Sequence, residues 1–247
     1  MILPELRDEI VLVTGGANGI GAAIVRALHA QGAQVYFCDV DQRAGRFLAK
    51  ELGRSSHFRK VDLLSESQIQ SWIGGIRKRG NPIHALINNA ARDPRIELAK
   101  TSVKDWDQLV ALNLRAYFLT CREAVKGMAP GSAIVNLASI TFHQGLAPMT
   151  CYVATKGGVL GFTRALAREI GPSRIRANTL SPGWVMTDRQ LKQHVRPATK
   201  QHIRQSQCLP DLIQPEEIAE VATFLISNAS RAITGQEILV DRGWYHS

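Results

Sequence analysis

The 247-residue sequence has no long hydrophobic run, only four cysteines and few aromatic residues. Its apolar stretches are far shorter than the roughly 18 residues that a membrane-spanning helix needs. Charged residues follow the start too early for a secretory signal, so we expect a cytoplasmic protein with no membrane partner. The cysteines form no CxxC pair, which argues against disulfides and a metal site. We interpret all of them as small hydrophobic residues, and the most reactive candidate is Cys151 (the others are Cys38, Cys121 and Cys208).

Acidic residues are also fewer than basic residues. The chain has 30 Lys and Arg residues against 21 Asp and Glu residues, a formal net charge of +9. A nucleic-acid binder would suit this balance, but the basic residues are spread along the chain, without a basic stripe interleaved with aromatics. We therefore interpret the charge as a cationic surface, with no nucleic-acid partner. Attraction of anionic substrates is the remaining alternative.

Short β-branched runs alternate with amphipathic segments along the whole sequence. Strands are predicted at 10–14, 34–39, 57–61, 85–88, 133–137, 176–180 and 237–240, and helices near 19–31, 65–79, 105–126, 152–170 and 215–227. This alternation predicts an α/β fold, a doubly wound parallel sheet with helices on both faces. No repeat or linker is visible, so residues 1–247 are predicted to form one domain. The least regular stretch, about 184–213, is predicted to be a lid over the substrate.

A glycine-rich turn, TGGANGIG at 14–21, follows the first predicted strand. Glycines there let the backbone approach a pyrophosphate at the amino end of the next helix. Asp39 ends the second strand, 18 positions after Gly21, where a carboxylate bonds the adenosine ribose and repels a 2′-phosphate. No Lys or Arg lies between Gly15 and Gly21. These features predict NAD rather than NADP. Asp62, after the third strand, either meets the adenine edge or caps a helix.

Tyr152 and Lys156 are four residues apart on a predicted helix and therefore project from one face. A nearby cation favours the phenolate form, so Lys156 is predicted to lower the pKa of Tyr152 for acid–base work. Ser139, 13 residues upstream at a strand end, can hold the substrate oxygen. Asn113 is a polar residue on an apolar helix face, either a satisfied core amide or the holder of a relay water that leads to Lys156.

With these motifs, the NNAA turn at 88–91 and Ser-Pro-Gly at 181–183, the sequence resembles the short-chain dehydrogenase/reductase family over essentially its whole length. The resemblance implies a Rossmann-type sheet of about seven strands and a homotetramer packed through its long helices. It assigns substrate orientation to Ser139, acid–base catalysis to Tyr152, ribose binding and tuning of Tyr152 to Lys156, and the relay water to Asn113. It also implies cofactor contacts from Gly15, Asn18, Gly19, Ile20, Gly21, Asp39, Asp62, Leu63, Asn89, Tyr152, Lys156, Pro182, Gly183, Val185 and Thr187. Many members have NNAG where this chain has NNAA.

The segments expected to line the substrate pocket are rich in hydrogen-bonding groups, which suit a polyol better than an acyl chain. The predicted substrate contacts are Arg92, Ser139, Thr141, Gln144, Tyr152, Trp184 and Arg189. The chain is similar to the family branch that oxidises sugars and sugar acids. That resemblance implies NAD-dependent oxidation of a secondary hydroxyl of an aldose or of a 2-keto-3-deoxy sugar acid such as 2-keto-3-deoxy-L-fuconate. The positive charge and the pocket arginines favour the acid.

Two alternatives stay open from the sequence. One is a 3-oxoacyl-thioester reductase, which normally prefers NADP and is disfavoured by Asp39. The other is a non-catalytic NAD-binding protein on the same fold. Near the carboxyl end, Trp244 either anchors a subunit interface or reaches the pocket of a neighbouring subunit.

Overall fold

A seven-stranded parallel sheet forms the centre of the protein, whose computed structural model describes residues 2–245. The strand order is β3-β2-β1-β4-β5-β6-β7, and every neighbouring pair runs parallel. The bounds are β1 (Ile10–Thr14), β2 (Gln34–Asp39), β3 (Ser56–Lys60), β4 (Ile83–Asn88), β5 (Met128–Leu137), β6 (Arg176–Pro182) and β7 (Glu237–Val240). The predicted fold class is confirmed.

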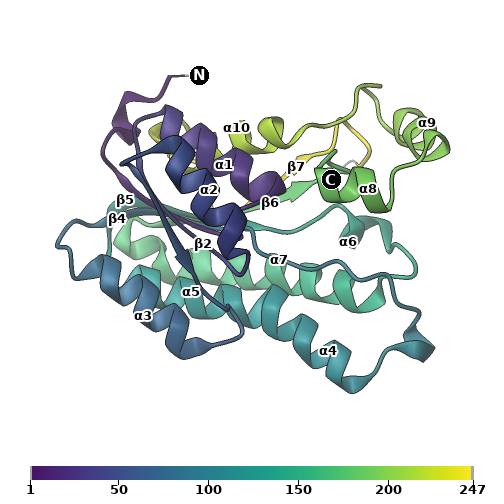
Figure 1. Cartoon of the computed structure of the whole chain (residues 1–247), viewed down its shortest axis with the longest axis horizontal. Coiled ribbons are helices and arrows are strands. Elements are labelled where there is room, and N and C mark those ends of the chain that lie inside the picture. Colours follow the sequence, from purple (N-terminus) through teal and green to yellow (C-terminus); the bar gives the residue numbers. More distant parts are fainter. Residues whose placement is uncertain (1, 246–247) are drawn as a thin grey trace.

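Helices cover both faces of this sheet, with α1, α2 and α10 on one side and α3, α4, α5 and α7 on the other (Figure 1). The bounds are α1 (Gly19–Ala30), α2 (Gln42–Leu52), α3 (Glu66–Arg77), α4 (Val103–Val110), α5 (Ala116–Val125), α6 (Thr141–Gln144), α7 (Thr150–Ile170), α8 (Asp188–Gln193), α9 (Pro197–Ser206) and α10 (Pro215–Ile226). A π-helical turn, η3 (Ala111–Arg115), joins α4 to α5. Short 3-10 turns are η1 (Pro4–Leu6), η2 (Leu98–Lys100), η4 (Gly171–Ser173) and η5 (Asn228–Ser230).

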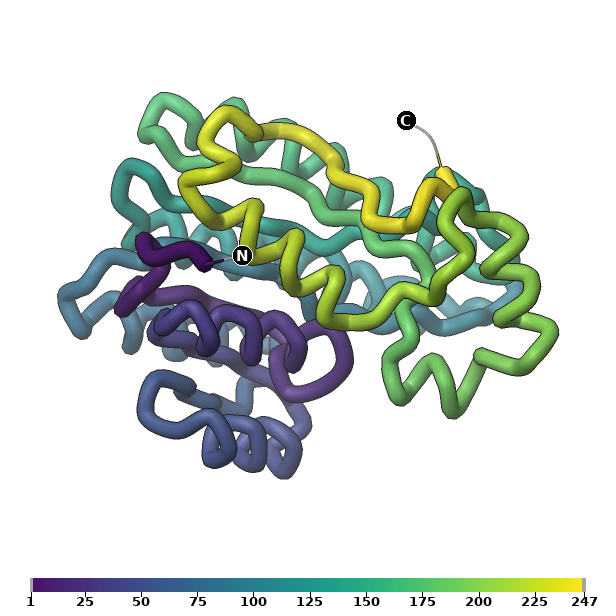
Figure 2. The backbone as a smooth tube through the Cα atoms, turned by 90° about the horizontal axis from the view of Figure 1, so that it is seen from above, coloured from purple at the N-terminus to yellow at the C-terminus, as the bar shows by residue number. Residues whose placement is uncertain are grey.

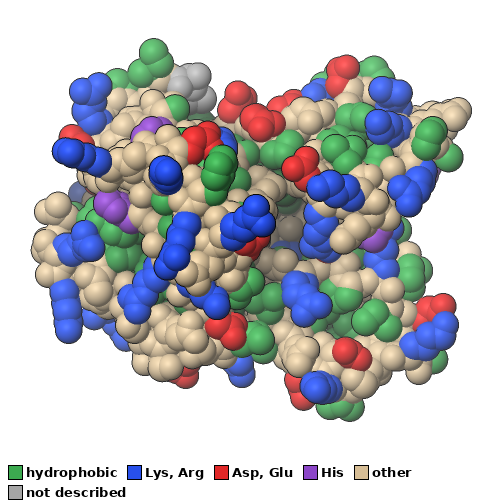
Figure 3. All heavy atoms as spheres, viewed as in Figure 1, with side chains coloured by type: hydrophobic (Ala, Val, Ile, Leu, Met, Phe, Trp, Pro, Cys, Tyr) green, Lys and Arg blue, Asp and Glu red, His purple; other side chains and the backbone are tan. Residues whose placement is uncertain are grey.

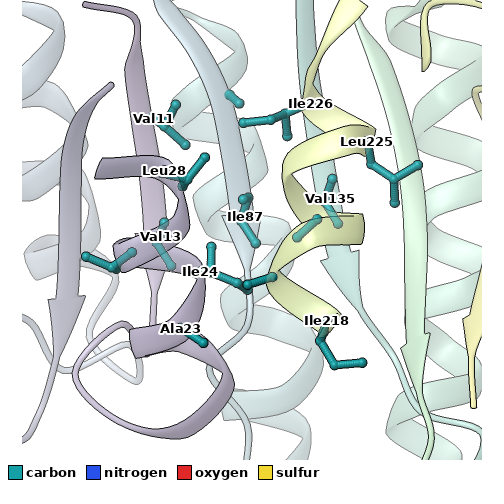
Figure 4. Close-up of a cluster of buried hydrophobic side chains, with 14 of the residues drawn as sticks. Val11, Val13, Ala23, Ile24, Leu28, Ile87, Val135, Ile218, Leu225 and Ile226 are labelled. Carbon is teal, nitrogen blue, oxygen red and sulfur yellow. The ribbon is translucent and has the colours of Figure 1, made fainter. Parts of the chain in front are cut away.

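The core explains why the strand runs are continuously apolar. All five residues of β1 are buried, because helices cover the sheet on both sides. On one face, α1 and α10 pack together over the central strands (Figure 4), through Val11, Val13, Ile24, Leu28, Ile87, Val135, Ile218, Leu225 and Ile226. On the other face, α3 and α5 bury Ile69, Trp72, Ile73 and Leu119. The sheet between these two helix layers is therefore a fixed base for the loops that leave its strands.

Three local predictions are corrected by the structure. Helix α2 was not expected; Asp41 begins it by accepting a hydrogen bond from the Ala44 backbone N–H. The predicted helix at 105–126 contains the π-helical turn. The stretch 184–213 is not irregular throughout, because it contains α8 and α9, and Pro197 supplies the first residue of α9. Figure 2 shows this segment at one end of the molecule, next to the chain that leads to Tyr245.

Two other expectations concern surface and membrane. Cys38 and Cys121 are buried, as expected for small hydrophobic residues, whereas Cys151 is half-buried and Cys208 is exposed. None of the helices within residues 2–245 is long and apolar enough to cross a membrane.

Strand β1 lies between β2 and β4, so the order of the chain reverses beside it. The crevice outside the carboxyl ends of the strands at such a reversal is the usual ligand site of open α/β sheets. The glycine-rich turn, the chain after β4, the end of β5 and the start of the 184–213 segment all meet at this edge.

Candidate active site

A cavity of about 890 Å³ opens at the carboxyl edge of the sheet. Figure 3 shows the molecule hollowed near the middle of one face, with Lys, Arg and acidic side chains at the rim. The cavity wall includes all the predicted cofactor and substrate residues except Gly21, and all the predicted catalytic residues except Asn113. Residues from opposite ends of the sequence thus line one cavity, which is large enough for one end of a dinucleotide together with a small substrate.

The glycine-rich turn is shaped by close backbone contacts. Gly15 has φ +64°, a conformation that favours glycine. A Cβ on Gly21 would lie 1.9 Å from the Gly15 carbonyl oxygen, so only glycine fits there. This packing explains why Gly21 supports the turn from behind and does not line the cavity. The amino end of α1, at Gly19, is thereby left facing the cavity, where its free N–H groups suit a phosphate.

The turn after β4 clamps the glycine-rich turn. The Asn89 side chain donates hydrogen bonds to the carbonyl oxygens of Thr14 (3.1 Å) and Gly15 (2.9 Å). In return, the Thr14 hydroxyl accepts from the backbone N–H groups of Asn89 (3.0 Å) and Ala90 (3.2 Å). The clamp holds the phosphate-binding turn against the segment that leads to the substrate end, and gives the NNAA motif a structural reason.

Asp39 lies at the end of β2 on the cavity wall. Its carboxylate accepts hydrogen bonds from the Ala17 N–H (3.1 Å) and the Asp41 N–H (3.0 Å). Asp62 lies on the same side, and its carboxylate accepts from the Leu64 N–H at 2.9 Å. The cations on the wall come from the chain after β4, from α7 and from the start of the 184–213 segment, at the other end of the cavity. Carboxylates therefore line this side of the cavity.

Lys156 is the buried cation of the site, with 1% of its surface exposed. Its Nζ donates a hydrogen bond to the Leu137 carbonyl oxygen (2.8 Å) and lies 5.5 Å from the Tyr117 ring centroid and 5.6 Å from that of Tyr152. Burial lowers the pKa of Lys156 to about 7, because an ammonium loses hydration in the interior. The ammonium and the phenol thus share one side of α7.

The phenol of Tyr152 is buried as well, and burial is the largest influence on its pKa, which it raises. The charge of Asp93 acts in the same direction, whereas a hydrogen bond with Ser139 and the charge of Arg189 lower the pKa. The expected lowering by Lys156 is therefore wrong for this structure. A lysine whose own pKa is near 7 is only partly charged at neutral pH, so it favours phenolate weakly.

Asn113 lies in the π-helical turn, fully buried and outside the cavity wall. Its amide donates to the Arg92 carbonyl oxygen (2.8 Å) and the Thr155 hydroxyl (3.2 Å) and accepts from the Arg92 N–H (2.9 Å). The Thr155 hydroxyl donates to the Tyr152 carbonyl oxygen at 2.7 Å. The side chain thus ties the chain after β4 to α7. A role for Asn113 in a water relay stays a prediction.

The substrate end is framed by three segments. Ser139 accepts hydrogen bonds from the Thr141 hydroxyl (3.0 Å) and N–H (3.2 Å). The guanidinium of Arg95 lies over the Trp184 ring, 5.2 Å from the ring centroid. Sequence reasoning missed Asp93, which lines the cavity and binds Arg189 and Gln190 of α8. Its only local signal was its place directly after Arg92 in a pocket segment. Trp244 lines the cavity of its own chain.

Comparisons with known proteins identify a family and several relatives. The family model described as enoyl-(acyl carrier protein) reductase matches residues 15–245. The probable galactose dehydrogenase GalD of Rhizobium meliloti (strain 1021) is 34% identical over 97% of this chain and 96% of its own. The D-xylose 1-dehydrogenase of Caulobacter vibrioides is 37% identical over 98% of both chains. The 3-oxoacyl-[acyl-carrier-protein] reductase FabG of Chlamydia trachomatis is 32% identical over 96% and 98%.

Solved structures are similar over the whole fold. A short-chain dehydrogenase/reductase from Brucella melitensis, described as glucose/ribitol dehydrogenase, superposes with a TM-score of 0.94 at 30% identity, covering 100% of both chains. A blue fluorescent protein from a metagenomic library, in complex with NADPH, gives a TM-score of 0.90 at 31% identity, covering 98% and 99%. The chain belongs to the short-chain dehydrogenase/reductase family. It is an oxidoreductase acting on CH–OH groups, and its family binds a nicotinamide cofactor.

Proposed function

We propose that the protein is an NAD-dependent dehydrogenase that oxidises a hydroxyl group of a sugar or sugar acid in non-phosphorylated sugar catabolism. The observation that carries the proposal is the single cavity in which Asp39 lies at one end and Ser139, Tyr152 and Lys156 at the other. A bound nicotinamide supplies the hydride acceptor. The cytoplasmic location and the homotetramer predicted from the sequence stay predictions.

Tyr152 is the group placed to move the hydroxyl proton. Ser139 lines the same cavity as the phenol and can hold the reacting oxygen beside it. In oxidation, the phenolate of Tyr152 takes the proton of the hydroxyl group. The hydride on the carbon that bears this group would pass to the bound nicotinamide, so the alcohol loses two electrons and becomes a carbonyl. Lys156 adds positive charge beneath the phenol, to the extent that it is protonated. Proton transfer by a positioned side chain of this kind contributes roughly 10²–10⁴-fold to a rate.

The choice of NAD is supported by Asp39. Its carboxylate lines the adenosine end and would repel a 2′-phosphate, which costs binding energy in a partly enclosed site. The NADPH in one structural relative is a property of that protein. The nearest cation along the chain, Arg43, belongs to α2 and is not part of the cavity wall.

The sugar class is supported by the polar wall and by the relatives. Thr141, Gln144 and Gln190 present hydroxyl and amide groups to the cavity, which suit a polyol better than an acyl chain. Two relatives are named as dehydrogenases of galactose and D-xylose. A 3-oxoacyl-thioester reductase is the second candidate, favoured by the FabG relative and opposed by Asp39 and the polar wall. A non-catalytic NAD-binding protein would not need Ser139, Tyr152 and Lys156 together.

A substrate panel tests the proposal. Purified protein is mixed with NAD or NADP and with neutral aldoses, aldonates, 2-keto-3-deoxy sugar acids and, in the reverse direction, a 3-oxoacyl thioester. Cofactor reduction or oxidation is followed by absorbance. The proposal expects NAD-dependent oxidation of at least one sugar or sugar acid. NADPH-dependent reduction of the thioester, with no sugar oxidised, would establish the second candidate in its place.

A further inference from the structure

A carboxylate lies at the substrate end of the cavity, where the only charged substrate contacts predicted from the sequence were arginines. The side chain of Asp93 is 18% exposed, and two side chains of α8 donate hydrogen bonds to it. Arg189 Nη2 donates to Asp93 Oδ1 and forms an ion pair with it. Gln190 Nε2 donates to Asp93 Oδ2 at 3.0 Å. The guanidinium of Arg189 is therefore already matched by a carboxylate of the same chain.

The other charged side chains at this end lie at the rim. Arg92, Arg95, Asp188 and Lys192 line the cavity but are exposed, so water and salt screen their charges. The guanidinium of Arg95 lies over Trp184 and forms no ion pair with any of residues 2–245. Asp93 is the least exposed acidic group among them, and its charge raises the pKa of both Tyr152 and Lys156. At Tyr152 this influence is larger than the opposite influence of Arg189.

We propose that Asp93 selects substrates by charge. It pairs with Arg189, and because its carboxylate is less exposed than the guanidinium, water screens its negative charge less, so that this charge dominates at the substrate end of the cavity. The site then accepts neutral sugars in preference to sugars that carry a carboxylate. This inference rests on the proposed function and narrows its substrate class. It also reverses the preference for an acidic substrate that the net charge and the pocket arginines suggested, since Arg189 is paired with Asp93 and the other cations at the rim of the cavity are exposed and screened.

Two unpaired polar atoms of residues that line the same cavity as Asp93 support a neutral polyol. Within the described residues, Trp184 Nε1 and Gln190 Oε1 are buried without hydrogen-bond partners. One is a donor and the other an acceptor, and an unpaired buried group of this kind costs about 1–3 kcal/mol. A sugar hydroxyl both donates and accepts, so a small movement of the lid on binding would satisfy the two. A carboxylate can serve the Trp184 N–H, but not the Gln190 oxygen or Asp93.

The test compares D-galactose with D-galacturonate, which share the hydroxyl at carbon 1 and differ by a CH2OH or carboxylate group at carbon 6. The ratio of their kcat/KM values with saturating NAD is measured for the wild type, Asp93→Asn, Arg189→Gln and Glu97→Gln. Glu97 is an exposed residue of the same loop, paired with Lys100 and outside the cavity wall, so its variant controls for the loss of one negative charge. If another aldose proves to be the substrate, it and its uronate replace this pair.

Wild type should prefer the neutral sugar by about tenfold or more, the size expected for one facing charge at moderate screening. Asp93→Asn should reduce the preference about tenfold, mainly through a lower KM for the uronate. Arg189→Gln should increase it, because Asp93 is then uncompensated, and Glu97→Gln should leave it unchanged. The opposite signs are decisive, since a mere lid latch predicts that both variants slow both sugars equally. If Asp93→Asn does not fold, the kcat/KM ratio of Arg189→Gln alone still tests the proposal.

Three results would overturn the proposed role of Asp93. The first is a wild type that prefers the uronate, and the second is an unchanged ratio of the two kcat/KM values in an Asp93→Asn variant with normal thermal stability and NAD binding. The third is the same change of this ratio in Asp93→Asn and Arg189→Gln. The first leaves the proposed function standing, because a sugar acid is still oxidised with NAD. Failure to oxidise any neutral or acidic sugar would instead refute the proposed function, and the proposed role of Asp93 with it.

Discussion

A buried lysine is an uncommon residue, and Lys156 has a measurable consequence for stability. Its pKa is about 7 in the folded chain against an ordinary value of 10.5. Between these values the unfolded chain binds more protons than the folded chain, so the free energy of unfolding rises with pH there. The stabilising contribution is therefore absent below pH 7 and complete above about pH 10.5.

We predict that wild type gains stability relative to Lys156→Met as the pH rises from 7 to 10, by on the order of 3 kcal/mol. Urea unfolding of both proteins at several pH values, without cofactor, gives the difference directly. The Met variant keeps the length of the side chain but cannot be protonated. A difference that does not change with pH would show that Lys156 keeps its ordinary pKa in the folded chain.

Among the single residues, Asp39 is the one that we propose sets the cofactor preference. Replacing it by alanine removes the negative charge that a 2′-phosphate would meet and the acceptor that ribose hydroxyls would use. We predict that Asp39→Ala lowers kcat/KM for NAD about tenfold and raises the NADP-to-NAD ratio. Initial rates with both cofactors check this, with Asp107→Ala, an exposed residue of α4, as the control for lost charge. An unchanged cofactor ratio would remove Asp39 from cofactor choice.

The residue scale also shows what sequence can and cannot predict. Tyr152, Lys156 and Ser139 were predicted because four residues make one helical turn and because strand ends meet at one edge. Asp93 could not be predicted, because its role depends on where α8 lies, almost a hundred residues later in the chain. The predicted lowering of the pKa of Tyr152 was wrong for a similar reason, because the extent to which the phenol is buried depends on the whole fold.

At the scale of elements, the turn between β1 and α1 should be the least tolerant of added volume. We predict that Gly21→Ala abolishes cofactor binding and costs about 1–3 kcal/mol of stability, because its Cβ meets the Gly15 carbonyl oxygen. Gly75→Ala is the matched control, since Gly75 lies in α3 with nothing within 4 Å of the added Cβ. It should keep NAD binding and gain up to about 1 kcal/mol. Equal thermal shifts for the two variants would contradict this account.

The strands were predictable because each is a short buried run whose apolar residues are continuous along the chain, as in β1. Helix α2 was missed because its outer face is strongly polar and Gly45 interrupts it; that glycine is required by the Phe58 ring, which a Cβ would meet at 2.1 Å. Helices α8 and α9 are short and pack around Met186, Val195 and Ile203. Tertiary packing of this kind leaves little periodic signal in the sequence.

At the scale of the whole molecule, the layer formed by α4 and α5 exposes apolar side chains. Val103 is 76% exposed, Trp106 41% and Phe118 44%. Exposed apolar groups gathered on one layer are typical of interfaces, and they agree with the predicted homotetramer. On the opposite layer, Phe47 of α2 is 69% exposed. The two layers therefore offer a matched comparison.

We predict a solution mass four times the 27.2 kDa of one chain, measured by light scattering after size exclusion. Phe118→Glu should shift the protein to smaller species, because a charge would be buried at the interface. Phe47→Glu should leave the mass unchanged. A monomeric wild type, or dissociation by Phe47→Glu alone, would contradict the assignment of the α4 and α5 layer to the interface.

The central claim for the molecule is that it oxidises a sugar hydroxyl with NAD through the phenol of Tyr152. The most direct measurement is the kcat of Tyr152→Phe on the best sugar of the panel, together with the Kd for NAD by calorimetry. We predict a kcat lower by about 10²–10⁴-fold, with a Kd for NAD within about twofold of wild type, because only a proton-transfer group is lost. A Tyr152→Phe variant that keeps wild-type turnover would contradict it.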